Sequence, residues 1–242
     1  VGVSDLHYFG ASDDLARPSI DRLRNETPSE TIGHHLGREL EQRIAFIDDD
    51  YRLSRLRLRL DHGWRAGTAS PYDVVWKIAV TGVDRDTALW DRIANDPNLR
   101  RQVIHAWLQE TVPAFTDAML AERLARTRAA VDAIRARGGE VVFVRPPSAP
   151  QFRFGEEGHL PRVRGWDALL AAADAVGVHF EDHAAMQGLE LPEYSHLTRA
   201  CARVHTDAYV RALATLTPRV RLRDDAPRPL APADCRTKPP AR

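Results

Sequence analysis

The sequence predicts an α/β protein whose doubly wound, mostly parallel sheet is flanked by helices in three layers. Residues 141–144 form an uninterrupted apolar run between a Gly-Gly pair and a Pro-Pro pair. A run of this kind is typical of a buried parallel strand. A helical pattern precedes the run, and a helix, a strand and another helix follow it. Such alternation favours a parallel sheet with helices on both faces.

The N-terminal part is predicted to start at the end of a strand. Residues 1–5 run from apolar positions into Gly, Ser and Asp, which favour turns, and residues 6–17 follow as a loop that leads into a short helix. The alternating Arg-Leu run at 55–60 fits a helix or a strand, and a helix is preferred because no turn signals bracket it. The other elements expected here are helical residues 29–65, irregular residues 63–86, and a helix over 91–107 that breaks at Asp96 and Pro97.

The C-terminal part carries the clearest periodicity. In order, we expect a helix over 111–138, a strand over 140–145, a helix over 164–176, a strand over 178–181, and a long final helix that begins near residue 195. Together these elements predict one domain over residues 1–216, with a helical insertion at about 29–110. Residues 217–242 are rich in Pro and Arg without periodicity, which predicts a disordered tail.

The overall composition is that of a globular protein and excludes several partners. Lys and Arg together number 34, as do Asp and Glu, so the net charge gives no reason to expect nucleic acid as a partner. No apolar run is long enough to span a membrane, and no signal peptide is evident. There is no Gly-rich phosphate loop and no zinc-protease helix motif, so no cofactor is predicted. Nothing in the sequence indicates the oligomeric state.

The histidines and cysteines do not form a recognisable metal site. His179 and His183 are four residues apart, but they fall on a strand and the loop after it, where helical spacing does not apply. Cys201 is predicted to be a small buried residue of the final helix, and Cys235 lies in the expected tail. Their number and spacing do not define a disulfide framework, and a disulfide between the two stays open. No metal is predicted.

Glu193 and His196 are the candidate catalytic residues. A carboxylate and an imidazole three residues apart meet when the chain turns into a helix. A histidine titrates near neutral pH, and a carboxylate on one ring nitrogen fixes the tautomer in which the other nitrogen is a base. The alternative is that Glu193 and Ser195 cap the following helix and that His196 is a surface residue of its first turn.

This block resembles the last catalytic block of the SGNH/GDSL hydrolase superfamily, Asp-x-x-His followed by Leu and a helix. Here Glu193 stands in place of Asp, and Leu197 follows the histidine. Gly2-Val3-Ser4-Asp5 resembles the third block of that family, Gly-x-Asn-Asp, with Ser4 in place of the oxyanion-binding Asn. Turn chemistry explains Ser4 and Asp5 equally well. The resemblance implies a flavodoxin-like three-layer fold, an esterase or acyltransferase, His196 as the base and Glu193 as its orienting partner.

Arg145 is a further candidate for the pocket. It follows the apolar run at what should be the carboxyl end of a strand, the edge where ligands bind to open α/β sheets. There it could hold a substrate carboxylate or phosphate. It could equally pair with Glu181 or Asp182 on the neighbouring strand.

The resemblance places the nucleophilic serine in a block upstream of Val1, so this chain alone is expected to be inactive. No pattern supports the other serines considered, which are Ser4, Ser12, Ser148 and Ser195. The implied substrate is a small acyl ester or an acylated carbohydrate, such as an envelope polysaccharide, and the implied location is periplasmic or membrane-anchored. The alternative is a catalytically inactive protein of the same fold that binds carbohydrate or serves as a scaffold. The Glu and Ser substitutions favour that alternative.

Overall fold

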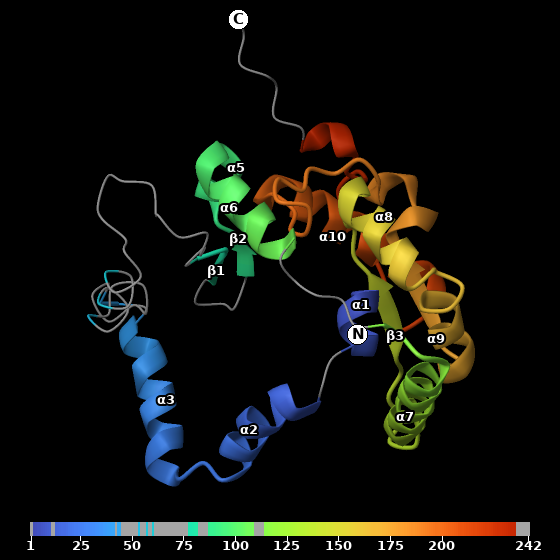
Figure 1. Cartoon of the computed structure of the whole chain (residues 1–242), viewed down its shortest axis with the longest axis horizontal. Coiled ribbons are helices and arrows are strands. Elements are labelled where there is room, and N and C mark those ends of the chain that lie inside the picture. The colour runs from blue at the N-terminus through green and yellow to red at the C-terminus, as the bar shows by residue number, and fades with distance from the viewer. Residues whose placement is uncertain are drawn as a thin grey trace, which may run out of the picture. The chain divides into compact units, whose positions relative to one another are not determined.

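The structure is a computed structural model, and it describes residues 2–10, 13–41, 43–44, 77–81, 87–108 and 114–235, together with Leu53, Arg57 and Leu60 (Figure 1). The chain divides into two compact units, which are described separately. Unit 1 combines Val1–Ala11 with Thr111–Arg242, and unit 2 is Ser12–Glu110. Unit 2 corresponds to the expected insertion, but it begins at residue 12 instead of about 29.

Unit 1 is built on a small parallel sheet. Strand β3 (Val142–Arg145) pairs in parallel with β4 (Val176–His179). On the other side of β3, Gly2 forms a parallel bridge with Val144, and the Val3 N–H donates to the Val144 carbonyl at 2.7 Å. The α/β class is therefore confirmed. Within the described residues the parallel sheet consists of these three neighbouring segments, so the larger doubly wound sheet is not seen there.

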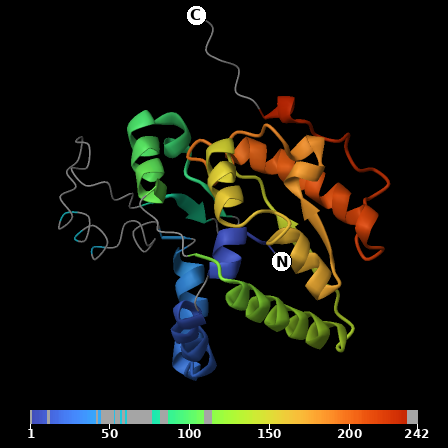
Figure 2. The same cartoon turned by 45° about the vertical axis from the view of Figure 1, so that its right-hand side comes forward.

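Helices precede, connect and follow these strands in chain order. They are α1 (Asp5–Gly10), α7 (Asp117–Arg135), α8 (Pro150–His159), α9 (Trp166–Ala173), the short 3-10 helices η3 (Phe180–Asp182) and η4 (Ala184–Met186), α10 (Arg199–Leu216), and the 3-10 helix η5 (Pro232–Asp234). Figure 2 shows α7 and α9 side by side, and the two helices pack against each other. The loop expected from residue 6 is wrong where α1 lies, whereas the short helix expected to follow is present as α2 (Asp13–Arg24).

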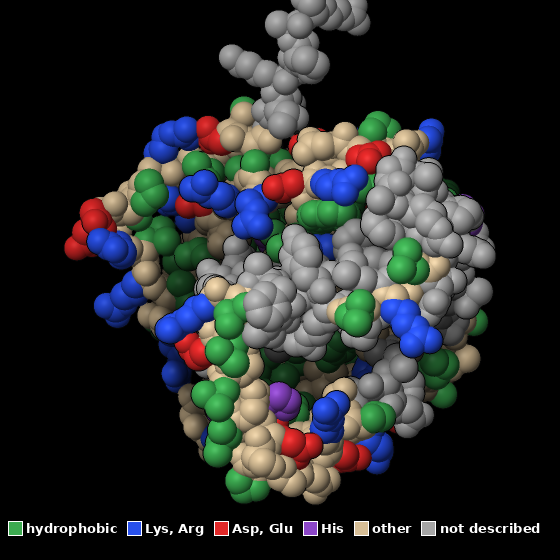
Figure 3. Space-filling view, turned by 90° about the vertical axis from the view of Figure 1, so that its left-hand side faces the viewer, with side chains coloured by type: hydrophobic (Ala, Val, Ile, Leu, Met, Phe, Trp, Pro, Cys, Tyr) green, Lys and Arg blue, Asp and Glu red, His purple; other side chains and the backbone are tan. Residues whose placement is uncertain are grey.

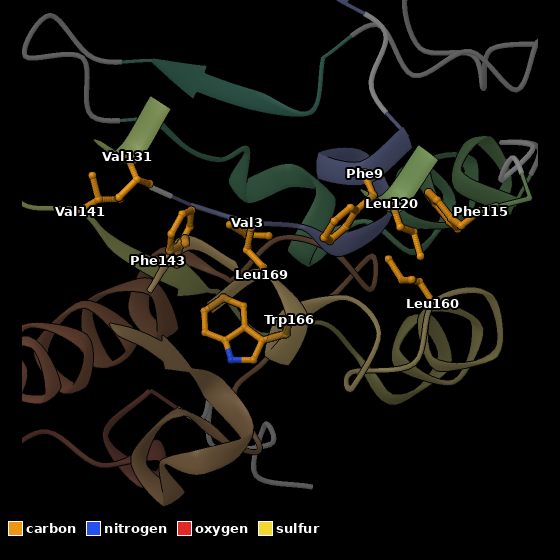
Figure 4. Close-up of a cluster of buried hydrophobic side chains, with 11 residues drawn as sticks. Val3, Phe9, Phe115, Leu120, Val131, Val141, Phe143, Leu160, Trp166 and Leu169 are labelled. Carbon is orange, nitrogen blue, oxygen red and sulfur yellow. The ribbon is translucent and has the colours of Figure 1, made fainter. Parts of the chain in front are cut away.

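The main hydrophobic cluster of unit 1 joins one face of the sheet to α7 and α9. Figure 4 shows Val3, Phe143, Leu169 and Trp166 in this cluster, and each is almost fully buried. Gly177 belongs to β4, where it pairs with Phe143 of β3, and a Cβ atom there would lie 2.6 Å from Cζ2 of Trp166. The expected strand over 178–181 therefore starts two residues earlier, and Gly177 allows the helix to approach the strand closely.

The opposite face of the sheet packs on α10. Val178, next to Gly177 along β4, is fully buried in a second cluster with Phe180, Ala208 and Ala212. Successive residues of a strand point to opposite faces, so α9 and α10 cover different sides of β4. Unit 1 thus has helices on both faces of a short parallel sheet. Among the described helices, none is both long enough and apolar enough to cross a membrane.

Unit 2 contains helices and a hairpin, so the expected helical insertion is only partly helical. Its described elements are α2, α3 (Pro28–Glu41), β1 (Ala79–Thr81), β2 (Thr87–Leu89), α5 (Asp91–Asn95) and α6 (Pro97–Leu108). Strands β1 and β2 pair in antiparallel fashion, where the sequence predicted an irregular segment. The break at Asp96 and Pro97 is confirmed between α5 and α6. Most of residues 55–60 lie outside the described residues.

On the face seen in Figure 3, basic and acidic side chains are interspersed.

The C-terminal segment is not the disordered tail that the sequence predicts, at least as far as Cys235. Cys235 forms a disulfide with Cys201 of α10. The Leu230 N–H donates to Asp207 at 2.9 Å, and Arg211 donates to the carbonyl of Pro227 at 2.6 Å. The lack of periodicity in this Pro-rich segment led to the prediction of disorder. The disulfide and the side-chain hydrogen bonds nevertheless fix the segment against α10. Residues 236–242 lie outside the described residues.

Candidate functional site

Glu193 and His196 meet in a turn that precedes the final helix. Oε1 of Glu193 accepts the backbone N–H of His196 and lies 2.9 Å from Nδ1 of its ring. Helix α10 begins only at Arg199, and Thr198 is its N-cap, accepting the Cys201 N–H at 3.3 Å. The predicted contact is confirmed, but the predicted helical geometry and the cap at Ser195 are wrong. Glu193 serves the backbone of the turn and the imidazole together.

The burial of the two side chains differs sharply. The Glu193 side chain is fully buried at 0% exposure, whereas that of His196 is 46% exposed. A buried carboxylate accepts hydrogen bonds, so the Nδ1 position of the ring holds its proton against Glu193 and Nε2 is the basic nitrogen. The arrangement therefore has a fixed, buried carboxylate behind an imidazole that reaches the surface.

Tyr194 gives the turn its shape. Its φ of 77° lies in the left-handed region, which residues other than Gly adopt at a cost of about 1–3 kcal/mol. Its N–H donates to the Leu191 carbonyl at 3.2 Å, and its own carbonyl accepts the Ala149 N–H at 2.9 Å. Its ring packs edge to face on Phe152, with 5.6 Å between the ring centroids. Contacts from the loop after β3 and from α8 thus hold the turn between Glu193 and His196.

The hydrogen bond to Glu193 raises the pKa of His196, and partial burial of the ring opposes this effect. The Glu193–His196 interaction therefore stabilises the fold fully below the unfolded pKa of about 6.5, and this contribution is lost as pH rises through the higher folded pKa. A general base needs the neutral ring, so catalysis by His196 would gain activity over the range in which this stabilisation is lost.

The variant Glu193→Gln tests the origin of this shift. Gln keeps an oxygen that accepts both hydrogen bonds but removes the charge, so the pKa of His196 should fall to about 6.5 or below. The measurement is an NMR titration of the His196 ring. Glu190→Gln, at a nearby exposed position, is the matched control and should leave the titration unchanged. An unaltered His196 pKa in Glu193→Gln would contradict the assigned cause.

Ser4 lies at the carboxyl edge of the same sheet. The parallel bridge of Gly2 with Val144 brings Ser4 level with the end of β3, immediately before α1. The Ser4 hydroxyl is partly buried, and its Oγ lies 3.2 Å from Nδ1 of His7. A Cβ atom on Gly2 would meet no atom within 4 Å, so packing does not require glycine there. The side chain of Asp5, also predicted for the site, lies outside the described part of the chain.

Arg145 is buried and does not face solvent as a ligand-binding group would. Its side chain is 2% exposed and donates to Glu156 at 2.5 Å. Neither reading of the sequence named this partner. Glu181 instead accepts from Arg153 at 2.6 Å, and Asp182 accepts from Arg162 at 2.8 Å. The pocket role predicted for Arg145 is therefore corrected to a buried ion pair.

His179 is a core residue. It stacks on Phe180 and meets the Trp166 ring edge to face, and its side chain has 0% exposure. Burial, aided by the positive charge of Arg162, lowers its pKa to about 4, so the ring is neutral at neutral pH. Over the described residues, no three His, Cys, Asp or Glu side chains are placed to hold a metal.

The sequence interpretation missed Glu156 and Tyr194, and it weighed Ser148 only as a nucleophile. Glu156 reaches Arg145 only through the fold, since it lies eleven residues further along the chain. The left-handed conformation of Tyr194 has no local signal, because such a position usually carries Gly or Asn. Only its place between Glu193 and His196 could have drawn attention to it.

The fold and the site together define an α/β protein with a carboxylate–histidine pair beside the carboxyl edge of a parallel sheet. Comparison of the chain with protein-family models, with curated proteins and with solved structures gives no match.

Proposed function

We propose that the chain is an SGNH-like serine esterase or O-acyltransferase that acts on a small acyl ester or an acylated carbohydrate. The observation that carries the proposal is the exposed His196 ring bound through Nδ1 to the fully buried Glu193. That arrangement suits a general base whose tautomer is fixed by a carboxylate. The proposal includes a doubly wound sheet, of which the three neighbouring parallel segments would be part.

Within this proposal we assign Ser4 as the nucleophile, a different role from the oxyanion contact that the resemblance implies for it. It stands where a parallel strand segment turns into a helix, the setting in which nucleophilic serines of α/β hydrolases stand. Ser4 is partly buried, and its Oγ lies 3.2 Å from Nδ1 of His7. The carboxyl ends of parallel strands lie at the same edge of a sheet. Ser4 and the loop after β3, whose Ala149 N–H binds the Tyr194 carbonyl, therefore lie at the same edge of this sheet.

The mechanism is acyl transfer through a serine ester. His196 takes the proton of Ser4 as the hydroxyl oxygen attacks the ester carbonyl, and Glu193 stabilises the imidazolium that forms. His196 then gives this proton to the departing alcohol, which leaves an acyl–Ser4 ester. Water, or a second alcohol in a transferase, attacks that ester while His196 again removes the attacking proton. Ser4 leaves with its proton restored.

Covalent labelling with a fluorophosphonate tests this assignment. The probe phosphonylates activated serines, and we expect mass spectrometry to find the label on Ser4. Ser4→Ala should abolish labelling, and His196→Ala should slow it by at least about 10²-fold. His159→Ala, an exposed histidine at the end of α8, is the control that should label at the wild-type rate.

His7→Ala decides between the two histidines. If His7→Ala removes labelling and His196→Ala does not, then His196 is not the base and the proposed mechanism fails. Absence of any label on Ser4 in the folded protein would reject Ser4 as the nucleophile.

A second candidate function is binding of acylated carbohydrate without catalysis. It is favoured by one observation, the bond from the His196 backbone N–H to Glu193, which gives the carboxylate a structural use besides its contact with the imidazole. Calorimetric binding of an acetylated oligosaccharide that the protein neither cleaves nor transfers would support this alternative over the enzyme.

The disulfide between Cys201 and Cys235 supports the periplasmic location implied by the resemblance. Disulfides form and persist in oxidising compartments and are rare in the reducing cytosol. We therefore infer that the protein folds in an oxidising compartment, where envelope carbohydrates are accessible as substrates.

A further inference from the structure

A buried ionic cluster includes residues of the loop between β3 and α8, which contacts the His196 turn. The Arg145 guanidinium donates to Glu156 at 2.5 Å, to the Ser148 hydroxyl at 3.2 Å and to the Pro146 carbonyl at 2.6 Å. Ser148 in turn donates to the same oxygen of Glu156 at 2.9 Å. Arg145 and Glu156 are 2% and 8% exposed, so water does not compete effectively for these bonds. The cluster fixes residues 146–148 between β3 and α8.

Ala149, the residue after Ser148, connects this loop to the turn that contains Glu193 and His196. Ala149 is buried, and its N–H donates to the carbonyl of Tyr194 at 2.9 Å. Phe152, in the first turn of α8, packs on the Tyr194 ring. Tyr194 is the left-handed residue that separates Glu193 from His196 along the chain. A conformation of this kind persists only when the surrounding structure determines it, and the Ala149 bond is one such constraint.

We propose that the Arg145–Glu156 pair is a positioning element for the Glu193–His196 dyad, acting through Ser148, Ala149 and the Tyr194 backbone. The inference rests on the proposed function, because it assigns this pair a role in that site. The bonds of Arg145 and Glu156 to Ser148 and Pro146 connect the pair to this loop. Loss of the Glu156 charge would remove this carboxylate from a buried guanidinium, and the loop would rearrange in response.

The test uses two variants of different severity and one matched control. Glu156→Gln removes the charge of the pair, and Ser148→Ala removes only the hydroxyl between Glu156 and the loop. Asp182→Asn is the control, because it removes one carboxylate charge from the Arg162 pair on η3. Circular dichroism establishes that each variant is folded. Ser148→Ala keeps the proposal testable if Glu156→Gln does not fold.

The first readout is the NMR titration of His196, which requires no enzymatic activity. We expect its pKa to move toward about 6.5 in Glu156→Gln, less far in Ser148→Ala, and not at all in Asp182→Asn. The second readout is ester hydrolysis, in which kcat should fall about tenfold in Glu156→Gln with KM nearly unchanged, because the dyad is misplaced by a fraction of an ångström. A purely structural pair would lower the melting temperature without moving the His196 titration.

The outcomes separate the two proposals. A folded Glu156→Gln or Ser148→Ala protein that keeps the wild-type His196 pKa overturns the positioning role. A wild-type protein that has the raised His196 pKa but neither cleaves nor transfers an acyl group overturns the proposed function. In that case the titration of the variants still decides whether the Arg145–Glu156 pair positions the turn.

Discussion

His196→Ala is expected to lower kcat/KM for hydrolysis of a short acyl ester by about 10³-fold or more. The variant removes the base that takes the proton of Ser4, and a positioned base contributes about 10²–10⁴-fold to such reactions. The measurement is steady-state hydrolysis of a chromogenic acetate ester by folded wild type and variant. His159→Ala should retain wild-type kinetics, because that histidine is exposed at the end of α8 and has no place in the proposed mechanism.

The pH dependence of the same reaction provides an independent check. In the proposed mechanism the neutral His196 ring is the active form, and the hydrogen bond to Glu193 raises the pKa of His196. Activity should therefore rise with pH and reach its plateau above the raised pKa, so the midpoint of the acid limb lies above about 6.5. In Glu193→Gln this midpoint should move down while kcat falls, because the imidazolium loses its counter-charge. Two results would reject the dyad as the catalytic pair. One is an acid-limb midpoint that is the same in Glu193→Gln as in wild type, and the other is full activity in His196→Ala.

Loss of the Cys201–Cys235 disulfide is expected to lower the free energy of unfolding by about 2–4 kcal/mol. The bond closes a loop with a sequence separation of 34 residues, which restricts the unfolded chain. Cys201 is fully buried in a small cluster with Leu189, Val204 and Cys235, so packing is also disturbed. Denaturant unfolding of wild type with and without reductant measures the effect.

The double variant Cys201→Ala with Cys235→Ala is the companion to this experiment. It should unfold at the denaturant midpoint of the reduced wild type and should show no further response to reductant. Amide exchange should increase over residues 217–235 in particular, because the disulfide links the far end of this segment back to α10. A wild-type midpoint that reductant does not move, in a protein shown to contain the bond, would contradict the expected stabilisation.

Local pattern was sufficient to predict the two strands β3 and β4 and the helices α7, α9 and α10 of unit 1, but not α1 or α8. The Gly-Gly and Pro-Pro pairs around the apolar run predicted β3, and the helical spacing of the preceding residues predicted α7. These signals are local because helix and strand periods are read within a few turns of chain. Boundaries were less accurate. The helix expected over residues 164–176 was predicted to end at Gly177, yet Gly177 lies inside β4. Glycine is needed there because a side chain would collide with Trp166.

The candidate site was predictable to the extent that it is local. Glu193 and His196 are close in sequence, so any tight turn brings them together, and the structure does so with a left-handed Tyr194 instead of a helix. Arg145 shows the opposite case. Its position at the end of β3 was predicted, but its partner Glu156 was not, because the register between strand and helix α8 decides that contact.

The sequence by itself determined the α/β class, the order α7, β3, α9, β4 and α10 within unit 1, and the Glu193–His196 contact, because each depends on residues near one another along the chain. The tertiary structure alone decided the pairing of Gly2 with β3, the burial of Arg145 and the bond between Cys201 and Cys235. Each of these joins segments far apart in sequence. Such contacts depend on how complete elements pack together, and no local period records that packing.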